Sequence, residues 1–167
     1  MTAKSDFSSA EWKILREAPH LVIFAVTVAG ASGFFGTMAE AMAPSPIISE
    51  ALKGSNQLLR EICAKEEMMA SIESIKDRAK DYGDFTGIQS SLRREAVDKA
   101  RAAVGLLRQK GSPEDVAAYR EFLITLGDRV ANAAKEGDFL GFGGERVSEH
   151  ERTLLSELAE AIGVLEA

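Results

Sequence analysis

The sequence is poor in the residues that cross-link a chain or bind cofactors. Of its 167 residues, one is a cysteine, Cys63, and two are histidines, His20 and His150. A single cysteine excludes an intrachain disulfide and fits a reducing compartment. Residues 1–9 are mostly polar and have no apolar core of the kind a secretory signal needs. We therefore expect a cytoplasmic protein without structural disulfides.

The chain also lacks an excess of positive charge, because its net charge is −6 and its pI is about 5.1. Such a surface repels phosphate backbones, and the densest basic spot, Arg93–Arg94, is small. We therefore expect neither nucleic acid nor an anionic membrane surface as a partner. The composition, 46% hydrophobic and 28% charged, is that of an ordinary globular protein. Its length suits one domain, so we treat residues 1–167 as a single domain.

Residues 21–39 carry no charge, and this length approaches the roughly 20 residues that a membrane-spanning helix needs. Glycines at positions 30, 33 and 36 interrupt the stretch. The unbroken apolar part, residues 21–31, is too short to cross a bilayer. The pattern therefore favours a helix over about 20–31 that is buried on all sides within the domain, and a membrane span is the less favoured alternative.

No segment alternates apolar and polar residues as a half-buried strand does. Helix start signals are frequent instead. Ser8–Glu11 and Ser148–Glu151 fit capping boxes, and Ser112–Asp115 combines a capping serine with a proline and acids in the first turn. Pro19 is expected to end or kink a first helix at Ala18.

Apolar residues at three- and four-residue steps predict the remaining helices. They cover about 37–43, 46–54, 56–82, 88–110, 113–136 and 149–162. Glycines at positions 83, 111, 137 and 163 are expected to stop them. The sequence therefore predicts an all-α fold, a compact bundle of about seven helices around the apolar helix 20–31.

A weak internal match suggests two related halves. A shift of 104 positions aligns Val22, Val26, Ala29 and Gly33 with Leu126, Val130, Ala133 and Gly137. A duplication producing a two-half pseudo-repeat and the ordinary punctuation of helices explain the match equally well.

The segments Val26–Gly33 and Val130–Gly137, each followed by a glutamate, Glu40 or Glu151, resemble the tellurite-resistance TerB-like helical proteins. The resemblance implies a compact all-helical domain of two related halves, loosely linked to stress or metal resistance. In that family, acidic residues in the turns are associated with divalent cations. Gly30 and Lys135 stand where the family pattern tends to place an aspartate, so the expectation of a metal is not carried over.

The residues before Glu40 and Glu151 also argue against a metal site. A calcium loop supplies side-chain oxygens at alternating positions before a closing glutamate. Counting back from Glu40 or from Glu151 meets only alanine, glycine, leucine or phenylalanine at those positions. We expect no metal and no cofactor. Glu66 and Glu67 are expected on a solvated helix face, and Cys63 in the core.

The glycine-rich loop 137–144 is the most unusual segment. It lacks the preceding strand and the lysine that phosphate-binding loops require. Its apolar side chains, Phe139, Leu140 and Phe142, together with Glu145, are instead candidate partner-binding residues. The alternative is that these side chains fold back over the helical core.

No acid–base pair or activated nucleophile is visible in the sequence, so an enzyme is not expected. We expect an interaction or accessory protein of a stress-response type, with a homo-oligomer or another protein as partner. A small-molecule or lipid-binding helical module, in which residues 21–36 line a pocket, is the alternative.

Overall fold

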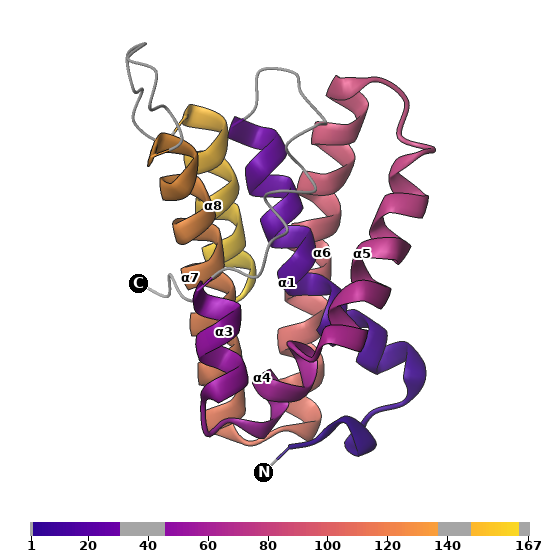
Figure 1. Cartoon of the computed structure of the whole chain (residues 1–167), viewed down its shortest axis with the longest axis vertical. Coiled ribbons are helices and arrows are strands. Elements are labelled where there is room, and N and C mark those ends of the chain that lie inside the picture. The colour runs from indigo at the N-terminus through magenta and orange to yellow at the C-terminus, as the bar shows by residue number, and fades with distance from the viewer. Residues whose placement is uncertain (1, 31–45, 137–147, 164–167) are drawn as a thin grey trace.

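The computed structural model describes residues 2–30, 46–136 and 148–163, which form seven α-helices and one short 3-10 helix (Figure 1). In chain order these are η1 (Lys4–Asp6), α1 (Ser9–Gly30), α3 (Pro46–Lys53), α4 (Gln57–Ile62), α5 (Lys65–Ala79), α6 (Phe85–Lys110), α7 (Pro113–Glu136) and α8 (Glu149–Ala161). The described part of the chain contains no strand. The predicted all-α fold is confirmed.

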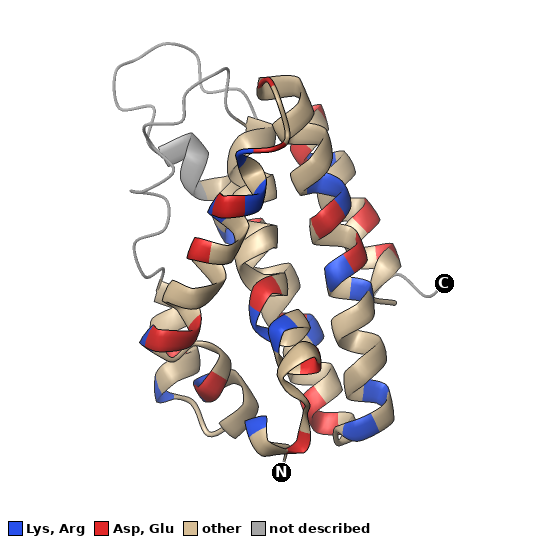
Figure 2. Ribbon diagram, turned by 90° about the vertical axis from the view of Figure 1, so that its right-hand side faces the viewer, with Lys and Arg blue, Asp and Glu red and all other residues tan. Residues whose placement is uncertain are grey.

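Helix α1 lies at the centre of the bundle and packs against α5, α6, α7 and α8 (Figure 1). Every residue from 17 to 26 is buried, which confirms an apolar helix enclosed by the others over this range. Towards its end Thr27 and Ala29 are partly exposed and Gly30 is exposed. Acidic and basic residues are interspersed along the surrounding helices (Figure 2). None of the helices formed by the described residues combines the length and apolarity needed to cross a membrane.

Pro19 lies inside α1, which corrects the expectation that a first helix ends at Ala18. Proline has no amide hydrogen, so the carbonyl of Leu15, four residues earlier, loses its usual helical donor. The buried hydroxyl of Tyr119, on α7, donates to that carbonyl oxygen at 2.7 Å. The two predicted helices are one helix, and a side chain from another helix supplies the hydrogen bond that Pro19 cannot make.

The predicted helix boundaries hold at most of the described helix ends. In the capping boxes Ser8–Glu11 and Ser148–Glu151, the serine hydroxyl accepts from the glutamate amide and the glutamate carboxylate accepts from the serine amide. Helix α7 starts at Pro113, as expected. Gly83 and Gly163 have φ values of 82° and 72°, in the left-handed region that favours glycine. Gly163 directly follows the C-cap of α8, but α5 already ends at Ala79, four residues before Gly83. The predicted helix 37–43 and the stop at residue 137 lie outside the described residues.

The predicted helix 56–82 is two helices, α4 and α5, which is a second correction. Cys63 ends α4, and Ala64 has an extended backbone with a ψ of 141° before α5 begins. The break changes which side of the following helix faces inward. Met69 continues the three- and four-residue apolar spacing that predicted one helix over 56–82, and is therefore expected in the core, but it is 58% exposed, whereas Ser71 and Ile75 are buried. Helix α5 therefore has few apolar contacts with the bundle.

Asp115 joins three distant parts of the chain at the base of the bundle. The amide and hydroxyl of Thr2 donate to its Oδ2 at 3.2 and 2.5 Å. The side chain of Asn56, which caps α4, donates to its Oδ1 at 3.0 Å. The hydroxyl of Ser112 donates to Oδ2 at 3.0 Å. One carboxylate therefore fixes the N-terminal segment and the start of α4 against the start of α7.

Helices α1 and α7 run in the same direction, and α6 and α8 run in the opposite direction (Figure 1). Helices α1 and α7 also pack against each other. Leu15 and Tyr119, which the hydrogen bond joins, lie 104 positions apart, the offset of the internal match. The start signals of α1 and α7, Ser8–Glu11 and Ser112–Asp115, have the same offset. A two-half pseudo-repeat is consistent with this arrangement and stays a prediction.

Candidate functional site

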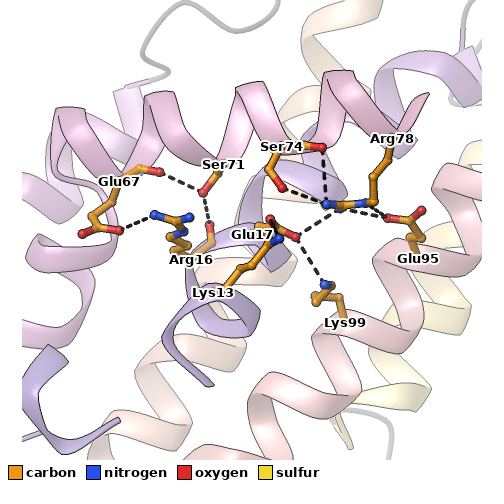
Figure 3. A network of polar contacts seen from close by, with 9 residues as sticks. All are labelled: Lys13, Arg16, Glu17, Glu67, Ser71, Ser74, Arg78, Glu95 and Lys99. Atoms are coloured by element: carbon orange, nitrogen blue, oxygen red, sulfur yellow. Dashed lines mark hydrogen bonds and ion pairs between the residues drawn. The ribbon is translucent and has the colours of Figure 1, made fainter. Parts of the chain in front are cut away.

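The four residues expected to bind a partner, Phe139, Leu140, Phe142 and Glu145, lie outside the described residues. Apart from the Asp115 contacts at the base of the bundle, polar side chains of the described part of the chain gather in two places. One is a buried network between α1, α5 and α6 (Figure 3). The other is an open groove between α6 and α8.

Glu17 on α1 is a carboxylate whose side chain is 0% exposed. Arg78 of α5 and Lys99 of α6 approach its Oε2 at 3.1 and 3.2 Å (Figure 3). Lys13, one turn earlier on α1, lies 3.8 Å from Oε1. Burial alone raises the pKa of Glu17, but the hydrogen bond from Arg78 and the positive charge of Lys99 help to lower it below 4.5. Glu17 is therefore ionised at neutral pH, and three helices share its charge.

Arg78 extends the network beyond Glu17. Its Nε and Nη2 donate to Oε2 of Glu95, on α6, at 3.3 and 3.1 Å. Its Nη1 donates to the hydroxyl of Ser74, one turn earlier on α5, at 2.9 Å. A planar guanidinium with five donors suits such a branching position better than an ammonium group does. Arg78 thereby ties α5 to both α1 and α6.

Glu67 fastens the other end of α5, which corrects the expectation that it lies on a solvated face. Its side chain is 12% exposed, and its Oε2 accepts from Trp12 Nε1 at 2.9 Å and from Arg16 at 3.0 Å. Lys4 forms an ion pair with Oε1. Its neighbour Glu66 is exposed, as expected. Charged and hydrogen-bonded contacts therefore hold α5 at both ends.

His20 lies next to this network but has no catalytic arrangement. Its Nδ1 is 3.1 Å from the Arg16 carbonyl oxygen, which also accepts from Ser71. Burial lowers the pKa of His20, so the ring is neutral at pH 7, and its buried Nε2 has no hydrogen-bond partner. A catalytic histidine needs an orienting acid and a nucleophile at its ring nitrogens, and the described contacts supply neither. His150 is exposed.

The buried nucleophile candidates are equally unreactive. Cys63 is in the core, as predicted, and burial raises the pKa of its thiol to about 12. The reactive thiolate is therefore negligible at neutral pH. Burial also raises the pKa of Tyr119, whose hydroxyl is bound to Leu15. Across residues 2–30, 46–136 and 148–163, no group of three or more His, Cys, Asp or Glu side chains could hold a metal ion. The network supports helix packing rather than a reaction.

The groove between α6 and α8 has a volume of about 740 Å³ and is open to solvent. Arg93, Arg94 and Arg101 of α6 line it together with Glu157 and Glu160 of α8. Arg93 and Glu157 form a two-point ion pair, with distances of 2.8 Å from Nε to Oε2 and 2.5 Å from Nη2 to Oε1. Small-molecule pockets are usually closed and mainly apolar. An open groove with charged walls is better suited to another macromolecule.

A ligand pocket lined by the apolar part of α1 gains no support. Residues 21–26 are at most 3% exposed and pack against the core. At Gly127 on α7, an added Cβ would lie 2.7 Å from Leu155 Cδ2 and 3.5 Å from Val22 Cγ1. The absence of a side chain at this position lets α7 and α8 approach each other closely, in contact with α1. Residues 21–26 are therefore packed by neighbouring helices.

No protein-family model, curated protein or solved structure matches the chain. Only the geometry of the chain itself therefore bears on its function. The resemblance to TerB-like proteins stays a prediction from sequence.

Sequence reasoning missed Glu17, Arg78 and Tyr119 as members of buried contacts. A weak signal existed for Glu17, since it directly precedes a long run of apolar residues. Tyr119 stands three residues after Val116 and four before Leu123, a helical spacing that indicates burial but not its hydrogen bond. Arg78 has no comparable local signal.

Proposed function

We propose that the chain is a non-catalytic helical domain of the cytoplasm, and that it binds another protein through the groove between α6 and α8. The observation that carries the proposal is the exposed, charged lining of this groove, to which two helices contribute. Arg94, on its rim, makes no ion pair with any described residue. Free charges on the rim of a groove steer partners and give specificity.

The buried polar groups support the non-catalytic part of the proposal. Glu17, Glu67 and Asp115 each make several contacts between helices, and each side chain is engaged in holding the bundle together. His20 is neutral and Cys63 is protonated at neutral pH. Neither His20 nor Cys63 therefore combines reactivity with access to a substrate.

A relation to the TerB-like family, with an accessory role in a stress response, belongs to the same proposal. Its support is the pair of similar sequence segments and the two parallel helices, α1 and α7, whose start signals lie at the same offset. A fold of two related halves is what that family leads one to expect.

The proposal is tested by placing a photoreactive amino acid in the groove. We expect a photoreactive residue in place of Val97, which lines the groove, to form a protein adduct in cells of the source organism. The matched control places it at Glu73, which is exposed on α5. Mass spectrometry of the adducts identifies the partner. Absence of an adduct from position 97, or the same adducts from both positions, would contradict the proposal.

A further inference from the structure

Three arginines form a regular line along the outside of α6. Arg94, Arg101 and Arg108 are exposed and follow one another at seven-residue intervals. Seven residues make almost two turns, so successive members lie about 10.5 Å apart along the axis and drift by about 20° around it. The core-facing residues of α6, such as Leu92 and Leu107, lie on the opposite side. We call this line the α6 basic stripe.

Helix α7 carries a line of opposite charge with the same spacing. Glu114, Glu121 and Asp128 are exposed and also follow one another at seven-residue intervals. The buried residues of α7, among them Tyr119 and Leu126, lie on the opposite side. We call this line the α7 acidic stripe. Its spacing and its drift around the helix match those of the α6 basic stripe.

The charges of the two stripes are largely unpaired within one molecule. Arg94 and Arg108 on α6, and Glu121 and Asp128 on α7, form no ion pair with any described residue. Arg101 pairs with Asp98 on its own helix at 3.1 Å, and both side chains are about 60% exposed. Each stripe points away from the shared core, so the two stripes do not face each other. Both are available to an outside partner.

We propose that the α6 basic stripe docks against the α7 acidic stripe of a second copy of this chain. The inference rests on the proposed function, because Arg94 and Arg101 also line the groove, and it names the partner. Three positive charges meet three negative charges at equal intervals, whether the two helices pack in parallel or antiparallel orientation. Helices whose contact lines repeat every seven residues pack with a crossing angle of about 20°.

The residues between the charges permit close approach. Gly105 lies beside the α6 basic stripe, and an added Cβ there would meet no atom within 4 Å. Ala117 is exposed beside the α7 acidic stripe. Asp98 of α6 and Glu160 of α8 border the α6 basic stripe, and Arg129 borders the α7 acidic stripe, with the opposite sign. The exposed charges of α6 itself remain in positive excess, and those of α7 in negative excess.

The association should be weak and sensitive to salt. Exposed ion pairs contribute little individually, and two molecules of net charge −6 repel each other overall. At about 0.01 M salt the Debye length is about 30 Å, and at about 1 M it is about 3 Å. We expect the average mass in sedimentation velocity to rise with protein concentration at the lower salt and to return to that of a monomer at the higher salt.

Charge reversal tests the pairing directly. One variant reverses α6 (R94E/R101E/R108E), and the other reverses α7 (E114K/E121K/D128K). Each variant alone presents two stripes of the same sign, so each should remain monomeric. An equimolar mixture restores opposite stripes and should associate, as should a chain that carries all six changes. The mixture also serves as the folding control, because misfolded variants would not recover association on mixing.

The inference is overturned if the wild-type chain stays monomeric at low salt, if either variant associates as the wild type does, or if the mixture fails to associate. Failure of the inference is distinguishable from failure of the proposed function. A monomeric chain whose residue 97 crosslinks to a different protein would refute the second copy as partner and retain the groove. Crosslinking from position 97 to a second copy of the chain would support both.

Discussion

Replacing Tyr119 by phenylalanine removes one oxygen atom and tests how α1 tolerates a proline in its middle. The hydroxyl is fully buried and donates to the carbonyl of Leu15 at 2.7 Å. Because Pro19 offers no amide hydrogen, this carbonyl has no replacement donor in the helix. Leaving a buried acceptor unsatisfied costs about 1–3 kcal/mol. For a chain of this size, that loss lowers the melting temperature by about 2–12 °C.

Tyr82 provides the matched control. Its hydroxyl is also buried, but it has no hydrogen-bond partner. Tyr82→Phe removes the same atom without breaking a bond and should leave stability unchanged or slightly raised. Urea denaturation followed by circular dichroism at 222 nm gives the free energy of unfolding of both variants.

A double-mutant cycle isolates the cause. Pro19→Ala restores an amide hydrogen that can bond the Leu15 carbonyl, so Tyr119→Phe should cost less in that background. A coupling energy above about 0.5 kcal/mol exceeds ordinary additivity. The reasoning is refuted if Tyr119→Phe costs no more than Tyr82→Phe, or if its cost is the same with and without Pro19.

Three further outcomes follow from the buried groups. Burial alone raises the pKa values of Glu17 and Asp115, but the partners of these carboxylates lower the pKa values below 4.5 and 3.8. The two carboxylates therefore contribute stability above pH 4.5 and 3.8. This stability is lost as the pH falls through their lowered folded-state pKa values. The urea concentration at the unfolding midpoint should therefore decrease as the pH is lowered below about 4, and it should decrease less steeply in Asp115→Asn. A midpoint independent of pH would contradict this. The buried thiol of Cys63 should react with a disulfide reagent at pH 8 only as fast as the protein unfolds, and rapid reaction in the folded state would show that the site is open. Val26→Asp places a charge at a position with 0% exposure and should lower the free energy of unfolding by about 3 kcal/mol or more. A melting temperature close to that of the wild type would show that this side of α1 is accessible.

The parts of the fold that the sequence predicted are those with local causes. The capping box Ser148–Glu151 involves neighbours in sequence, and its bonds form as expected. The apolar residues of α6 that recur at three- and four-residue steps from Ile88 to Leu107 are buried because a single helical period determines which side faces the core. They are Ile88, Leu92, Ala96, Ala100, Val104 and Leu107. Gly163 directly follows the C-cap of α8 and stops this helix through its own backbone conformation. Such features need no knowledge of the rest of the chain.

Two of the wrong predictions depended on distant partners, and the third on a helix break that has no local signal. Pro19 normally breaks a helix, and what lets α1 continue is a hydroxyl 104 positions away. No glycine or proline marks the break at Ala64, so the apolar spacing suggested one helix across it. Glu67 looked solvated because its partners, Trp12 and Arg16, belong to another helix. The candidate residues around Phe139 lie outside the described part of the chain, so their role stays a prediction.

The central position of α1 has a consequence for biosynthesis. This helix leaves the ribosome before the helices that cover it, and α8 follows only after roughly 130 further residues. At about 5–20 residues per second, translation of that length takes roughly 7–26 s. During this interval the apolar surface of residues 21–26 has no native cover, and the nascent chain is a substrate for chaperones that hold exposed apolar segments. Cells that lack such chaperones should yield less folded protein, and the yield should recover when translation is faster.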